Sequence, residues 1–269
     1  MVRFGKMEKY HPRFVDKGYW AKLYIQIFGC ASISAYNFFF HFKRAISGAK
    51  FQKILDAGCG KGDFTFYLAE KYPYVEIDAW DLSDPDMHDL GENIKICDEI
   101  QKQENINNIV FYEKDLKDLR AREEFDFIFC IHVLEHIPDN KVVLQNFYTA
   151  LKQGGYLHVQ MPSQNGMVPI FPKKYYKTFY EWEKVEHVGE HYTLEDLSAI
   201  LKKLGFTVIS SRTDGGFMQS TAWHISEVLI SNNRVFLAGL VIPLLKFMVY
   251  VGNLFLDNGK GSLVVVARK

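Results

Sequence analysis

The sequence lacks an excess of either charge, because 32 Lys and Arg side chains balance 32 Asp and Glu side chains. A protein that holds DNA or RNA through its phosphates usually carries a basic excess or a basic stripe. Neither is seen along this chain. We therefore expect no nucleic-acid partner.

Cysteine is scarce, and repeats and low-complexity tracts are absent. The four cysteines (Cys30, Cys59, Cys97 and Cys130) form no CxxC pair, which predicts neither a disulfide framework nor a zinc site. The first residues, MVRFGKMEKYHPRF, lack the apolar core of a signal peptide. A reducing, cytoplasmic location is the expectation that follows.

Aromatic residues, in contrast, are abundant at 15% of the chain, with 22 Phe and 15 Tyr. They concentrate in Tyr19–Phe42 and Tyr175–Trp182. The first of these lies within residues 1–48, which we predict to form an N-terminal helical cap. Aromatic-rich appendages are typical of a cap over an apolar substrate or of contact with a membrane interface.

Residues 49–269 alternate between short apolar runs and helical patterns, and we predict one α/β domain there. The predicted strands are Lys53–Asp56, Val75–Trp80, Ile109–Glu113, Phe125–Ile131, Tyr156–Met161, Phe206–Arg212 and Ser262–Arg268. Strands separated by helices, with connections of ordinary length, favour a mostly parallel, doubly wound, Rossmann-like sheet.

A glycine-rich turn follows the first predicted strand, in the order Asp56-Ala57-Gly58-Cys59-Gly60-Lys61-Gly62. Such a turn lets the backbone approach a ligand closely, although a plain strand-to-helix turn is the alternative. The dinucleotide fingerprint is G-x-G-x-x-G, and here Asp63 stands where its third glycine would fall. An acidic side chain there would repel a pyrophosphate.

Two more carboxylates follow the next two predicted strands. Asp81 ends the second strand, where a carboxylate accepts hydrogen bonds from ribose hydroxyls. Asp115 follows the third strand, where it could accept from an adenine amino group, with Leu82 and Leu116 as apolar walls. One such Asp is usually a solvated turn residue, but three at successive strand ends indicate one shared nucleoside site.

The segments ILDAGCGKG, DAWDLS, EKDL, FDFIFCIHVLEHIPD and LKQGGYLHVQMP together resemble the ordered motifs of class I S-adenosylmethionine methyltransferases. They are most similar to the small-molecule and lipid-quinone branch, and the resemblance covers roughly Lys53–Lys269. It implies a seventh strand that is antiparallel between the fifth and sixth. It also implies S-adenosylmethionine as cofactor, held by Asp56, Gly58, Cys59, Gly60, Gly62, Asp81, Leu82, Asp115, Leu116, Ile131 and His132.

Methyl transfer is an in-line displacement that sometimes needs a base, and histidine is the natural one near neutral pH. We take His191 and His132 as the candidate catalytic residues. His132 with His136, and His187 with His191, are also i,i+4 pairs that would suit a metal if each pair lay on a helix. No cysteine or ordered carboxylate joins them in sequence, so we predict no metal site.

A hydrophobic insertion at about 215–261 separates the last two strands and includes VFLAGLVIPLL. Its hydropathy would suit a membrane span, but a single crossing would leave the seventh strand on the wrong side of the bilayer. A packed helical cap, an interfacial helix pair and a dimer contact remain open, with Pro243 kinking or ending a helix. The insertion predicts a hydrophobic or lipid-linked acceptor, contact with a membrane surface, and a monomer or homodimer.

Two other classes of function stay open at this point. One is a non-catalytic module that keeps the methyltransferase fold for binding or assembly, and the other is a nicotinamide-dependent reductase. Binding of S-adenosylmethionine or of NAD(P)H discriminates among the three.

Overall fold

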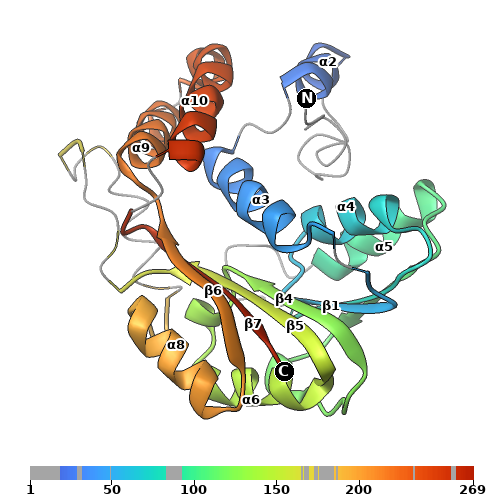
Figure 1. Ribbon diagram of the computed structural model, residues 1–269. Coiled ribbons are helices and arrows are strands. Elements are labelled where there is room, and N and C mark those ends of the chain that lie inside the picture. Colours follow the sequence, from blue (N-terminus) through green and yellow to red (C-terminus); the bar gives the residue numbers. More distant parts are fainter. Residues whose placement is uncertain are drawn as a thin grey trace.

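A computed structural model describes residues 19–28, 32–48, 50–82, 93–164, 166, 170–172, 175, 185, 187–232, 234–255 and 259–269 (Figure 1). Cys30 and most of the aromatic segment Tyr175–Trp182 lie outside these residues.

One seven-stranded sheet forms the centre of the molecule, in the order β3-β2-β1-β4-β5-β7-β6. β7 is antiparallel to both β5 and β6, whereas the other neighbouring pairs are parallel. The predicted Rossmann-like sheet with an antiparallel last strand is therefore confirmed. Its strands are β1 (Lys53–Ala57), β2 (Glu76–Asp81), β3 (Ile109–Glu113), β4 (Phe125–Ile131), β5 (Leu151–Pro162), β6 (Thr207–Asp214) and β7 (Ser262–Arg268).

Helices cover both faces of this sheet (Figure 1). Thr193 caps one of them by accepting a hydrogen bond from the Asp196 N–H at 3.1 Å, and Gly205, at φ +105°, follows its end. The helices along the sheet are α4 (Asp63–Lys71), α5 (Asn93–Gln103), α6 (Asn140–Ala150) and α8 (Leu194–Lys203), with 3-10 turns η2 (Leu116–Asp118) and η3 (Leu134–His136).

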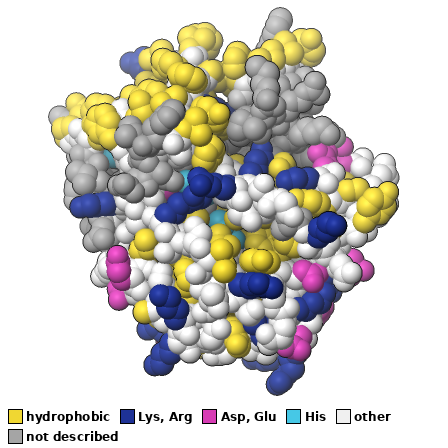
Figure 2. All heavy atoms as spheres, viewed as in Figure 1, with side chains coloured by type: hydrophobic (Ala, Val, Ile, Leu, Met, Phe, Trp, Pro, Cys, Tyr) yellow, Lys and Arg dark blue, Asp and Glu magenta, His cyan; other side chains and the backbone are white. Residues whose placement is uncertain are grey.

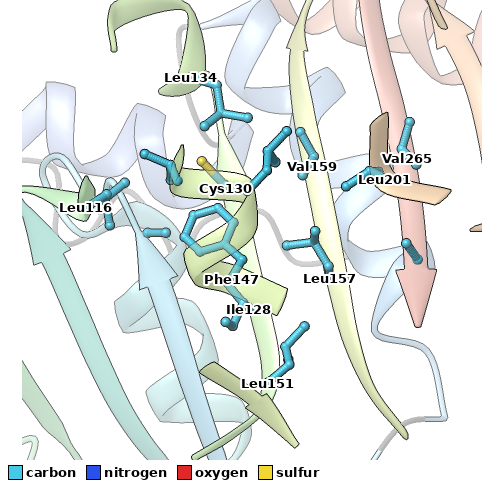
Figure 3. Packing of buried hydrophobic residues seen from close by; sticks show 14 of the residues in the cluster. Leu116, Ile128, Cys130, Leu134, Phe147, Leu151, Leu157, Val159, Leu201 and Val265 are labelled. Carbon is cyan, nitrogen blue, oxygen red and sulfur yellow. The ribbon is translucent and has the colours of Figure 1, made fainter. Parts of the chain in front are cut away.

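Two hydrophobic layers hold the sheet between its helices. β4 is buried almost throughout, as its apolar sequence predicts, and supplies alternate residues to the two layers. Figure 3 shows one layer, in which Phe147 of α6 and Leu201 of α8 pack against Ile128 and Leu157. The other layer joins β1, β2 and β4 to α4 and α5.

Helix α3 (Ile33–Ala45) packs directly onto the second layer. Phe42 is fully buried and its ring lies 4.8 Å from that of Phe129 on β4. Phe39 stacks on Phe64 of α4 at 4.1 Å. The domain boundary at residue 48 remains a prediction, but α3 shares its core with the sheet.

The insertion at about 215–261 contains two helices, α9 (Phe217–Ser231) and α10 (Val235–Phe255), which lead back to β7. They lie with α2 (Tyr19–Phe28) beyond the sheet, at the top of Figure 1. α10 continues through Pro243, which cannot donate to the carbonyl of Gly239. That carbonyl accepts a hydrogen bond from the Tyr24 hydroxyl of α2 at 2.5 Å, so the proline is accommodated within the helix.

Candidate active site

The glycine turn after β1 adopts a backbone that few other residues tolerate. Gly58, Gly60 and Gly62 have φ values of +87°, +51° and +78°. A Cβ on Gly58 would lie 2.1 Å from Val133 Cγ2, whereas a Cβ on Gly60 would meet nothing within 4 Å. The turn is therefore closely packed against the loop after β4 on one side and open on the other.

Asp56 lies beneath this turn and is 3% exposed. Its Oδ2 accepts a hydrogen bond from Thr65 Oγ1 of α4 at 2.5 Å. Burial, together with the nearby carboxylates Asp81 and Asp63, raises the pKa of Asp56 to about 8 despite that hydrogen bond. A cation bound at the turn would favour its ionised form.

Asp81 closes the site from the end of β2. Its Oδ2 accepts a hydrogen bond from the Gly60 N–H at 2.6 Å, which joins β2 to the turn. Burial raises the pKa of Asp63, the first residue of α4, to about 6, although Lys61 lowers it. Carboxyl groups thus gather at the N-terminal end of α4, where a pyrophosphate would have to lie, and a cationic ligand there would favour their ionised forms.

Asp115 stands at the end of the neighbouring strand. β3 pairs with β2 so that Asp81 lies opposite Glu113, and the Lys114 N–H donates to Asp81 O at 2.9 Å. Asp115 itself accepts from the Lys117 N–H at 2.8 Å and caps η2. The structure therefore brings Asp56 and Asp81 to one turn, with Asp115 at the adjacent strand end.

The apolar residues predicted around the nucleoside divide into two groups. Leu82 is 53% exposed at the strand end, whereas Leu116 is 4% exposed and packs into the core beneath. Cys59 is buried and Ile131 is half-buried at the end of β4. Leu82 is thus the more accessible of the two predicted walls.

His132 follows the end of β4 and lines a neighbouring cavity. It has φ +55°, an unusual backbone for histidine, and its ring stacks on Phe38 of α3 at 4.0 Å. Its Nδ1 lies 3.1 Å from Oε1 of Glu135, which is 1% exposed. Burial opposes ionisation of Glu135, but His132 and His136 outweigh it and lower the pKa of that carboxyl.

A chain of histidine rings continues from η3. The His136 and His187 ring centres lie 5.1 Å apart, and those of His187 and His191 lie 5.3 Å apart. Burial, with His136 and His191 nearby, lowers the pKa of His187 to about 4 although Glu135 opposes the shift. The two i,i+4 pairs are not helical pairs, because His132 and residues 187–191 lie outside helices.

The cavity beside His132 has a volume of about 520 Å³. Ile33 and Phe38 of α3 and Trp223 of α9 supply apolar lining, while Asn37, Gln219 and both predicted catalytic histidines, His132 and His191, supply polar groups. A volume of this order suits a drug-sized organic molecule. It is therefore the candidate acceptor site.

A buried carboxylate, Asp214 at the end of β6, anchors the polar side of this cavity. It is 1% exposed, and its Oδ2 accepts from Asn37 Nδ2 at 3.0 Å and from Gln160 Nε2 at 3.2 Å. His41 Nε2 lies 3.2 Å from the same oxygen. These contacts join α3 to the sheet and fix Asn37 at the cavity wall.

Sequence reasoning missed Glu135, Phe38, Asp214 and the α9 residues of the cavity. Glu135 belongs to the VLEH segment quoted above, but that motif alone does not assign a role to its carboxylate. The other residues come from α3, β6 and α9, and no local pattern predicts that these elements meet.

The sequence and the fold are similar to those of known proteins. Residues 29–211 match the sequence family described as "Methyltransferase domain". The chain is 33% identical over 104 residues to malonyl-[acyl-carrier protein] O-methyltransferase 2 of Ilyobacter polytropus. It is 27% identical over 127 residues to ubiquinone biosynthesis O-methyltransferase of Acinetobacter baumannii.

These two matches cover 39% and 46% of this chain, and 37% and 47% of the relatives. The chain thus matches less than half the length of either. Among solved structures, phosphoethanolamine N-methyltransferase 2 of Haemonchus contortus, in complex with S-adenosyl-L-methionine, superposes with a TM-score of 0.61 at 19% identity. That alignment covers 100% of this chain and 60% of the other.

Proposed function

The chain belongs to the methyltransferase domain family, and from this membership we propose that it transfers the methyl group of S-adenosylmethionine to a hydrophobic small molecule or lipid-linked acceptor. The cofactor would lie along the ends of β1, β2 and β3, with its methionine part on the Gly58–Gly62 turn. Its ribose would lie at Asp81 and its adenine at Asp115. The three carboxyl groups of Asp56, Asp63 and Asp81 support a ligand that carries a sulfonium and an ammonium group, because such a ligand favours the ionised form of each carboxyl.

The observation that carries the acceptor class is the cavity of about 520 Å³ that adjoins His132. It lies between α3 and the insertion helix α9, so that an acceptor within it reaches the cofactor edge through His132. In-line transfer needs the acceptor atom close to the methyl group and aligned with the bond that breaks. His132 and His191 are the proposed bases or orienting groups for that atom.

A hydrophobic face on α10 supports contact with a membrane surface. Its large side chains recur at helical spacing and are 60% or more exposed at Phe236, Leu240, Leu244 and Phe247. Figure 2 shows hydrophobic side chains gathered at this end of the molecule. We name these four residues the α10 apolar face.

The opposite side of α10 packs inside the protein, with Ala238, Ile242, Leu245 and Val249 buried. One stretch, Phe236–Leu254, is long and apolar enough to cross a membrane by length and composition. However, α10 packs against α9 and α3, and the chain then returns to β7 in the sheet. We therefore propose that the helix lies on a cytoplasmic membrane surface rather than across the bilayer.

Calorimetry tests the cofactor class. Titration with S-adenosylmethionine and, separately, with NADPH should give one-to-one binding of the first and none of the second. Binding of NADPH alone would favour a reductase. Absence of both, in protein with a cooperative thermal transition, would favour a non-catalytic module.

The acceptor class needs its own experiment. Protein purified without detergent should be extracted and the released organic molecules identified by mass spectrometry. Candidates are then tested with radiolabelled S-adenosylmethionine, in the presence and absence of liposomes. We expect methylation of an apolar acceptor that liposomes stimulate, and equal activity on water-soluble acceptors without liposomes would contradict the proposal.

A further inference from the structure

Glu135, His136 and His187 form a cluster of metal-binding groups that the proposed methyl transfer leaves without a role. One ligand atom from each lies within 4.8 Å of the other two. Ligand atoms about 2.1 Å from a tetrahedral metal ion are separated by about 3.4 Å. The three side chains are thus near the required arrangement, and a small contraction would complete it.

The carboxylate is the least expected member of this cluster. Glu135 is 1% exposed, and neither of its oxygens has a hydrogen-bond partner of acceptable geometry within the described part of the chain. The neighbouring His132 Nδ1 lies 3.1 Å from Oε1. Oε2 has no such neighbour among the residues that the structure describes, and a buried carboxylate oxygen without a donor is costly unless a cation or a further donor completes its environment.

The backbone around the cluster is built to hold His187 against η3. The Gly189 N–H donates to the Glu135 carbonyl at 2.8 Å, and a Cβ on Gly189 would lie 2.4 Å from the carbonyl oxygen of Leu134. Only glycine therefore allows this approach. The fully buried Asn140 adds hydrogen bonds from its Nδ2 to the carbonyls of Leu134 at 2.9 Å and of Glu190 at 3.1 Å.

We propose that Glu135, His136 and His187 bind a divalent transition-metal cation of the zinc class. Two imidazoles and one carboxylate form a ligand set that suits such an ion and leaves a coordination position open. All three residues line the candidate acceptor cavity, so the cation would lie at the wall of that cavity. This role rests on the proposed function: the cation would hold an oxygen atom of the acceptor beside His132.

The test uses tag-free, full-length protein and Co²⁺ as the probe, because bound Co²⁺ reports its coordination geometry by visible absorption. After treatment with a chelator, we expect one Co²⁺ per chain, displaced by an equivalent of Zn²⁺. His136→Ala, His187→Ala and Glu135→Gln should each weaken binding by about 100-fold or more, since even loss of a supporting contact costs 10- to 100-fold. Gly189→Ala should weaken it while every ligand remains.

The matched control is His224→Gln, which removes another histidine of the same cavity without touching the cluster. It should keep the wild-type affinity for Co²⁺. Equal affinity in the wild type and the three ligand variants, or no stoichiometric binding to the wild type, would overturn the proposal.

Binding of S-adenosylmethionine, measured in the same preparations, separates this proposal from the proposed function. Variants that bind the cofactor normally are folded, so a loss of Co²⁺ in them reports the metal site alone. A wild type that binds Co²⁺ but not S-adenosylmethionine would leave the metal site standing and contradict the methyltransferase assignment.

Discussion

α8 and α10 each bury one face in the protein, yet their outer faces differ in polarity. α8 buries Leu197 and Leu201 against the sheet. Its ends carry charged side chains that are solvated and that interact favourably with the helix dipole. These are Glu195 and Asp196 in the first turn and Lys202 and Lys203 in the last.

α10 has an apolar inner side and, outside, the α10 apolar face. It has no acidic residue in its first turn and no basic residue in its last. Its Lys246 is 6% exposed and donates to the Phe28 carbonyl at the end of α2 at 2.9 Å. An outer face that is apolar on one helix and charged on another indicates two different surroundings. We expect substitutions at the ends of β1, β2 and β3, where the cofactor would lie, to change cofactor affinity alone. Substitutions on the α10 apolar face should change membrane binding alone.

The largest effect is expected at the cofactor edge. In Gly58→Ala the new Cβ would overlap Val133 in a backbone that already disfavours alanine, so the turn must move. We expect affinity for S-adenosylmethionine to fall by about 100-fold or more, whereas Gly60→Ala, with open space, should cost less than about tenfold. Calorimetry measures both. Equal losses would contradict the packing argument, and vesicle binding should be unchanged in each.

The next effect concerns the α10 apolar face. Combined Leu240→Ser, Leu244→Ser and Phe247→Ser should weaken co-sedimentation with liposomes by at least about tenfold, because each buried side chain contributes roughly 1.5–3 kcal/mol. Val142→Ser and Tyr74→Ser are the control, since Val142 of α6 is 48% exposed and Tyr74 is 97% exposed. Retained liposome binding in the triple variant would disprove the membrane role. Cofactor affinity should not change.

A pH dependence of cofactor binding should follow from Asp56. With a pKa of about 8, Asp56 is mostly protonated at pH 7 and must lose its proton to pair with a cationic ligand. Raising the pH removes this cost, so affinity for S-adenosylmethionine should rise by roughly 5- to 10-fold from pH 7 to 8.5. Asp56→Asn should bind more weakly, with a flat pH profile. A wild-type profile that is flat or falls over this range would contradict the placement of the ligand.

The smallest effect tests how α2 joins α10. Tyr24→Phe removes the hydrogen bond to the Gly239 carbonyl that Pro243 leaves without its helical donor. We expect a loss of about 1 kcal/mol in the free energy of unfolding, measured with urea. In a Pro243→Ala background the helix supplies its own donor, so the same change should cost less. An equal cost in both backgrounds would refute this explanation of the uninterrupted helix.

Much of the sheet could be predicted because its signals are local. Apolar runs between turn residues placed β3, β4 and β7 at their observed ends, and the family and fold predictions are confirmed. β5 begins at Leu151, earlier than the predicted Tyr156. Gly154 and Gly155, which usually break regular structure, lie inside the strand where its register with β4 shifts.

The cavity could not be predicted, because it depends on contacts between distant segments. Phe38 reaches His132 only because α3 packs on the sheet, and His187 reaches His136 only because Gly189 lets two backbones touch. The roles of the cofactor and catalytic residues remain predictions.

The most direct test of the central claim is a crystal structure of the complex with S-adenosylhomocysteine. We predict the ribose hydroxyls within about 3.2 Å of the Asp81 carboxylate, the adenine amino group beside Asp115 and the amino acid end on the Gly58–Gly62 turn. A nucleoside bound elsewhere, with Asp56, Asp81 and Asp115 facing no common ligand, would contradict the account.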